Sequence, residues 1–230
     1  MLRISLLLIV FTVLNTSSFA KEKASKTIIR SVTVTQMKFL RAVDGKYQKK
    51  HGIHLKLKKT IKLGMLGSTK ASQGEAWLDN GKMKLEIYKP DPSTIIADKE
   101  YLWIVSPPPA DFADGKLQVL RASLKSDRAK SQGLIQLLTG GGVLKYFKVS
   151  GLQNEGDNIT YFLQPDKQSI EFKRAQIVIS RDKKVIKELR YWDQMDNETT
   201  FAFLETSFDK KFPQKLFNYT PPKGAEVITY

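Results

Sequence analysis

An alternation of apolar and polar residues, recurring from residue 54 onward, constrains the fold more than any other feature of the chain. In residues 54–63, Leu55, Leu57 and Ile61 fall on one face of an extended strand together with Lys59, while the opposite face is mostly lysine. Alternation or short apolar runs return at residues 75–79, 82–87, 101–105, 159–164, 170–180, 184–192 and 199–207. Short turns, as at 181–184 and 193–198, separate several of these segments, so we predict eight to eleven strands in a mostly antiparallel meander.

Two segments break this alternation. Residues 28–43 carry apolar side chains at roughly helical spacing and predict an N-terminal helix. Residues 126–147 predict two short amphipathic helices joined by a flexible run of glycines. Because an amphipathic helix must cover an apolar surface, the expected fold class is mainly β with α: one incomplete (open) antiparallel β-barrel capped by short helices.

The first twenty residues have the pattern of a secretory signal peptide. Arg3 precedes an apolar stretch over residues 4–14, and the small residues Ser18 and Ala20 match the usual cleavage pattern. We place the cut after Ala20, so that residues 21–230 form a single domain. No later stretch is apolar over the ~18 residues that a membrane-spanning helix requires, and we expect the mature chain to be soluble.

Composition restricts the chemistry of the mature chain. It has no cysteine, which excludes disulfide scaffolds, thiolate metal sites and a lipid-anchored N-terminal cysteine. Without Arg3, 37 basic residues face 23 acidic ones, a formal net charge of +14. Such a charge favours acidic partners or anionic membrane surfaces, and secretion argues against a nucleic acid target.

Catalytic motifs are missing from the sequence. There is no H-E-x-x-H and no G-x-S-x-G, and residues 64–70 contain phosphate-loop residue types in the wrong order. In a strand, His51 and His54 point to opposite faces, which argues against a shared metal. Acidic residues are abundant, but no spacing selects a catalytic pair. We therefore expect neither an enzyme nor a cofactor.

Several motifs occur in a recognisable order. GEAWL at 74–78, GKMKLEI at 81–87, Pro90, IIAD at 95–98 and LW at 102–103 are followed by YFLQP at 161–165, DQMDNET at 193–199 and FNYTPPKGAEVI at 217–228. Over about residues 70–228 the chain resembles the LolA family of periplasmic lipoprotein carriers. It departs from the family pattern at Lys99, which replaces a glycine, and at Asp79 and Asn80, where the family commonly has an arginine that holds its lid. That lid contact therefore does not carry over.

The resemblance implies a periplasmic, monomeric carrier whose cavity shelters acyl chains. Its implied partners are triacylated lipoproteins, an inner-membrane lipoprotein-releasing ABC transporter and an outer-membrane lipoprotein acceptor. The implied lid residues are Leu137, Leu138, Gly140, Gly141, Gly142 and Phe147. Lys56, Lys58 and Lys62 are the expected partner contacts, because a basic exterior favours encounter with an acidic patch.

An alternating sheet supplies such a cavity by directing every second side chain inward. The expected acyl-chain residues are Trp77, Met83, Leu85, Ile87, Leu102, Ile104, Leu163, Ile177, Ile179, Leu189, Tyr191, Phe201 and Phe203. Met83 and Leu85 are the strongest candidates, since non-aromatic, adaptable side chains suit a mobile guest. The same residues would equally fill an ordinary packed β core.

Three other functions compete with a lipoprotein carrier. The same fold could carry or sense another lipid or acylated ligand. A secreted hydrolase acting on an anionic polymer would depend on a single carboxylate. A structural envelope protein would bind anionic envelope components through its basic surface, in a salt-sensitive manner.

Overall fold

A single sheet of twelve strands dominates the computed structural model, which describes residues 29–49, 52–65, 67–108, 115–125, 142–166 and 173–229. The strands are β1 (Ile53–Lys62), β2 (Thr69–Asp79), β3 (Lys82–Lys89), β4 (Ser93–Ala97), β5 (Tyr101–Ser106), β6 (Gln118–Ser123), β7 (Phe147–Glu155), β8 (Asn158–Pro165), β9 (Arg174–Ser180), β10 (Val185–Trp192), β11 (Glu198–Ser207) and β12 (Glu226–Thr229). The predicted signal peptide and most of the predicted helical segment 126–147 lie outside the described residues.

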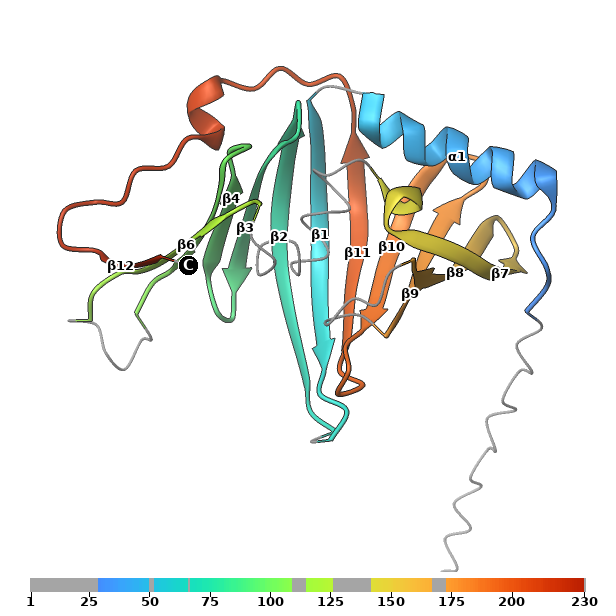
Figure 1. The fold of residues 1–230 in the computed structure, drawn as a ribbon, viewed down its shortest axis with the longest axis horizontal. Coiled ribbons are helices and arrows are strands. Elements are labelled where there is room, and N and C mark those ends of the chain that lie inside the picture. The colour runs from blue at the N-terminus through green and yellow to red at the C-terminus, as the bar shows by residue number, and fades with distance from the viewer. Residues whose placement is uncertain are drawn as a thin grey trace, which may run out of the picture.

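Two antiparallel meanders make up this sheet. β1 to β6 pair in sequence, β7 to β11 pair in sequence, and β1 pairs with β11 to join the two halves. β12 adds to β6 in parallel and forms one edge, while β7 forms the other, so the sheet does not close (Figure 1). The open, mainly antiparallel architecture that the alternation predicted is confirmed.

The number of strands exceeds the eight to eleven that we expected. The additional strands carry weak alternation, for different reasons. A bulge near Val149 and Gly151 interrupts the pattern in β7, and every residue of β12 is exposed. Pairing with a neighbouring strand, rather than a buried face of its own, therefore holds β12 in the sheet.

The N-terminal helix, α1 (Val34–Lys49), begins six residues later than predicted and continues past residue 43. Its start is set by a capping box. The backbone N–H of Gln36 donates to Thr33 Oγ1 at 3.3 Å, and the backbone N–H of Thr33 donates to Gln36 Oε1 at 2.9 Å. Before this cap, Arg30 pairs with Leu152 of the edge strand β7 through two backbone hydrogen bonds. The segment that we predicted as the first turns of the helix therefore protects a sheet edge.

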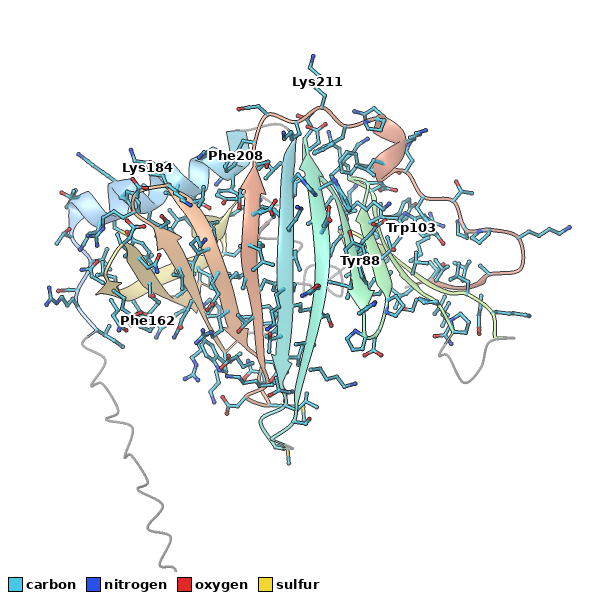
Figure 2. All side chains as sticks on the ribbon, turned by 180° about the vertical axis from the view of Figure 1, so that it is seen from behind. Tyr88, Trp103, Phe162, Lys184, Phe208 and Lys211 are labelled. Carbon is cyan, nitrogen blue, oxygen red and sulfur yellow. The ribbon has the colours of Figure 1, made fainter. Side chains whose placement is uncertain are left out.

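The two faces of the sheet differ in what covers them. The inner face carries the main hydrophobic core and is covered in part by α1, which lies in front of the sheet in Figure 1. The outer face, seen in Figure 2, carries a small second cluster of Ile96, Trp103 and Val119. Tyr219 and Ala225, from the C-terminal segment that leads to β12, pack against this second cluster.

Polar contacts fix α1 on the inner face. Leu40 and Val43 are buried against the core, and the hydroxyl of the fully buried Tyr161 donates to the carbonyl oxygen of Gln36 at 2.9 Å. Further along the helix, Tyr47 Oη accepts the backbone N–H of Ile186 at 3.0 Å. Burial raises the pKa of both tyrosines to about 12, so the two hydroxyls stay protonated at physiological pH.

Candidate ligand-binding face

The structure brings together nearly all the residues that we expected to face a cavity. Twelve of the thirteen belong to the main core cluster on the inner face, ten of them buried, with Ile104 and Tyr191 partly buried at its margin. They come from six strands, because alternation along each strand places them on the same side of the sheet. That these residues contact acyl chains stays a prediction.

Trp77 is the exception, and its expected place on the inner face is wrong. In β2 the buried positions are Gly74, Ala76 and Leu78, so the side chain of Trp77 projects from the opposite face. There its ring stacks on His54, with centroids 5.3 Å apart, and Lys84 Nζ lies 5.8 Å from the ring centroid. The register of β2, with Gly74, Ala76 and Leu78 on the inner face, decides the side of Trp77.

The inner face also includes residues that we had not named as site residues. Leu55 and Leu57 of β1, Leu152 of β7, and Ile159 and Tyr161 of β8 are all buried in the same cluster. Alternation in residues 54–63 had already indicated Leu55 and Leu57. Leu152 follows a bulge in a strand that we did not predict, so no pattern identified it.

A small void lies between α1 and the inner face. It has a volume of about 20 Å³ and is lined by Asp44, Tyr47, Val143, Ile177, Ile186, Leu189 and Phe203. A void of this size accommodates about one water molecule. An acyl chain that lay along this part of the inner face would therefore have to displace the elements that cover it.

Asp44 of α1 holds the chain where it enters β7. Its carboxylate accepts the backbone N–H of Val143 at 2.8 Å and of Leu144 at 3.4 Å, in the 3₁₀-helix η2 (Val143–Lys145), and the side-chain amide of Gln48 at 3.0 Å. Burial raises the pKa of Asp44, although these three hydrogen bonds oppose the shift. The contact thus joins the helix to the end of the glycine-containing segment.

The lid residues that we expected fall into three groups. Leu137, Leu138, Gly140 and Gly141 lie outside the described residues. Gly142 has φ +90° and packs so closely on α1 that a Cβ would lie 2.1 Å from Gln48 Nε2. Phe147 was wrongly assigned to a lid helix: it is the first residue of β7 and is buried in the main core, because β7 begins directly after η2.

The three lysines expected to contact a partner lie on the outer face of β1. Lys56 pairs with Glu205 at 3.0 Å and Lys62 with Glu198 at 3.5 Å, both across the β1–β11 boundary. Lys58 is exposed and makes no ion pair with any described residue. The pair of Lys56 with Glu205 is exposed and therefore weak, whereas Glu198 is only 17% exposed and also lies 3.6 Å from Arg190 Nε. Partner contact through these lysines stays a prediction.

A second hollow lies on the outer face, beneath the C-terminal segment. Its volume is about 420 Å³, and it separates β3 to β5 from the segment that contains the 3₁₀-helix η3 (Gln214–Phe217). Tyr219 lines it and packs on Trp103 with ring centroids 5.5 Å apart. Its hydroxyl is buried and has no hydrogen-bond partner among the described residues.

Within the described part of the chain, no group of three potential metal ligands is present. His54 Nε2 lies 2.6 Å from Glu75 Oε2, and His51 is outside the described residues. No helix in the described ranges is both long and apolar enough to cross a membrane.

The comparisons with known proteins point to one family. Residues 48–220 match the family model described as outer membrane lipoprotein carrier protein LolA. An outer-membrane lipoprotein carrier protein of Chromobacterium violaceum is 26% identical over 150 residues, covering 65% of this chain and 68% of the relative. A protein of the same name from Legionella pneumophila is 23% identical over 151 residues, covering 64% and 68%.

One solved structure agrees on the fold. An uncharacterized conserved protein from Thermus thermophilus superposes with a TM-score of 0.50 at 10% identity, covering 85% of this chain and 99% of that one. A LolA superfamily protein from Nitrosomonas europaea has a TM-score of 0.46 at 10% identity, covering 80% and 97%. Since the family model spans most of the sequence, and the fold is the open sheet described above, this chain belongs to the LolA family.

Proposed function

We propose that this protein is a periplasmic carrier that shields the acyl chains of lipoproteins released from the inner membrane and delivers them to an outer-membrane acceptor. One observation carries the proposal: in a LolA-family chain, an unclosed sheet presents a continuous apolar inner face built from most of its strands. The curated relatives named as lipoprotein carriers support the same role.

The physical need for such a face follows from the properties of the cargo. Exposing an acyl chain to water costs roughly 0.8 kcal/mol per methylene, on the order of 12 kcal/mol for ~15 methylenes before losses are counted. A carrier that crosses an aqueous compartment must remove most of that surface from water. An open sheet, unlike a closed barrel, can do so without enclosing the guest permanently.

Entry of the cargo at the part of the inner face beneath α1 requires the elements that cover it to move. The void beside α1 holds about one water molecule, so the contacts that hold α1 compete with an acyl chain for the same surface. Among the described residues, those contacts include the hydrogen bonds of Tyr161 to Gln36 and of Asp44 to Val143 and the buried side chains of Leu40 and Val43. Met83, fully buried in β3, has the flexible side chain that adapts to a mobile guest.

The proposed partners lie on either side of the periplasm. An inner-membrane lipoprotein-releasing ABC transporter would supply the cargo, and the acceptor would bind acyl chains more tightly, so that transfer runs downhill. Exposed Lys58, with the net positive charge of the chain, would assist encounter with acidic patches on these proteins.

Depletion of the protein in cells tests this function directly. We expect lipoproteins to accumulate at the inner membrane, and mass spectrometry of protein purified from the periplasm to find acylated peptides bound. Lipoproteins that reach the outer membrane normally would contradict the proposal. Copurified phospholipid without acylated peptide would instead support a carrier of another lipid.

A further inference from the structure

Lys59 is a cation on the apolar inner face. In β1 it follows the buried Leu55 and Leu57 with the same alternation, and directly opposite it on β11 is the buried Phe201. Its ammonium lies 5.8 Å from the centroid of the Phe201 ring. The neighbouring lysines of β1, Lys58 among them, project from the other face.

The row of residues that crosses the sheet at Lys59 is otherwise uncharged. Strand pairing aligns Lys59 with Phe201 of β11, Leu189 of β10 and Ile177 of β9, all three buried in the main core. On its other side, Lys59 pairs with Ser72 of β2. The row is therefore amphipathic. The hydroxyl of Ser72 and the ammonium of Lys59 lie at one end, and the apolar side chains of Phe201, Leu189 and Ile177 continue from them.

Among the described residues, no acidic group neutralises the charge of Lys59. No carboxylate of the described residues lies within ion-pair distance of Lys59, whereas Lys56 and Lys62 on the outer face each pair with a glutamate. Burial lowers the pKa of Lys59, as expected for an ammonium held against apolar side chains. A methionine or leucine would serve the core better here, so stability does not account for the lysine.

We propose that Lys59 binds the anionic head of a lipid, a carboxylate or a phosphate, whose alkyl chain lies along Phe201, Leu189 and Ile177. The inference rests on the proposed function, because it uses the same inner face, and it adds a ligand class with a charged head group. The esters and amide that join acyl chains to a lipoprotein are uncharged and gain little from an ammonium.

The dimensions of the row suit such a ligand. Lys59 and Ile177 are separated by three strand spacings of about 4.8 Å, or about 14 Å in all. One leaflet of a bilayer, half of the ~30 Å hydrocarbon thickness, has about the same depth. A single lipid chain anchored at Lys59 would therefore reach across the apolar part of the row.

A pair of fluorescent probes that differ in charge and by one methyl group tests the assignment. Purified mature protein is titrated with cis-parinaric acid and with its methyl ester. We expect the acid to bind at least tenfold more tightly than the ester. Lys59→Met should abolish this preference by weakening the acid alone, and Lys59→Arg should retain it. Lys183→Met, the same charge change at an exposed lysine in the turn between β9 and β10, is the matched control and should leave both affinities unchanged.

Competition distinguishes the two sources of the anion. Lysophosphatidic acid and lysophosphatidylcholine of equal chain length are used to displace the bound acid. Preferential displacement by lysophosphatidic acid assigns a phosphate head group, and displacement by neither, with oleate still effective, assigns a carboxylate. Either result supports an anion site at Lys59.

Three outcomes overturn the inference. The wild-type protein could bind acid and ester equally, or Lys183→Met could weaken the acid as much as Lys59→Met does. In either case a bound triacylated lipopeptide leaves the carrier function intact. If the acid, the ester and the lipopeptide all fail to bind, the proposed function fails together with the inference. Circular dichroism melts of the three variants verify that each is folded.

Discussion

The carboxylate of Asp44 accepts the backbone N–H of Val143 at 2.8 Å, across 99 residues of sequence. This buried hydrogen bond ties α1 to the start of the β7–β11 meander. It lies beside the void under the helix, at the point where the chain re-enters the sheet. Contacts of this kind decide how firmly the inner face is covered.

Removing the Asp44 carboxylate should destabilise the fold. Asp44→Ala leaves the buried N–H of Val143 without an acceptor, and we expect the free energy of unfolding to fall by about 1–3 kcal/mol. Urea denaturation measures the change. Asp91→Ala, which removes an exposed carboxylate, should stay within about 0.5 kcal/mol of the parent. Equal losses of unfolding free energy at the two sites would contradict a stabilising role for the hydrogen bonds of Asp44.

The raised pKa of Asp44 predicts a pH dependence of stability. The folded chain keeps the Asp44 proton to a higher pH than the unfolded chain, so between the two pKa values the folded state binds more protons. The stabilisation due to Asp44 is therefore largest at low pH and declines as the pH rises through that window. The decline amounts to about 1.4 kcal/mol for each tenfold difference between the acid dissociation constants of Asp44 in the folded and the unfolded chain.

Asp44→Asn isolates this contribution, because the amide does not titrate. The difference in unfolding free energy, parent minus variant, should decrease as the pH is raised from about 4 to about 7 in urea titrations. A difference that increases over this range would mean that the hydrogen bonds from Val143, Leu144 and Gln48 outweigh burial.

Gly142 should be intolerant of any side chain. At φ +90° an L-residue is strained, and a Cβ would also lie 2.6 Å from both carboxylate oxygens of Asp44. We expect Gly142→Ala to lower the free energy of unfolding by about 1–3 kcal/mol.

Gly156→Ala is the matched control for this variant. Gly156 also has a positive φ, +56°, but open space surrounds the position of its Cβ. Its substitution should cost about 1 kcal/mol, the backbone component alone. Thermal melts of both variants compare the two sites. Equal losses of stability in Gly142→Ala and Gly156→Ala would rule out the steric conflict with α1.

Removal of a tyrosine hydroxyl should affect the free energy of unfolding differently at Tyr161 and at Tyr219. Tyr161 donates to Gln36 on α1, so Tyr161→Phe should cost about 1 kcal/mol. Tyr219 has a buried hydroxyl without a partner among the described residues, so Tyr219→Phe should be neutral or stabilising by up to about 1 kcal/mol. Urea denaturation of both variants provides the measurement. A marked loss at Tyr219 would indicate that a bound molecule or another segment uses its hydroxyl.

Alternation was a reliable guide in β1, which has one buried face. It placed Leu55, Leu57 and Lys59 on the same side of β1, and the structure agrees. It failed where the backbone departs from a regular strand. The bulge in β7 concealed Leu152, and the start of β7 at Phe147 could not be separated from a helical end by apolar content alone.

The sequence by itself determined the class of fold and the composition of each strand face, because a period of two is a local property of the chain. Only the tertiary structure decided which face became the inner one at Trp77, which residue holds η2, and that Lys59 has no described counter-ion. These depend on strand register and on contacts between distant segments. Such contacts are set by the free energy of the whole packed sheet and leave no periodic signal in the residues that make them.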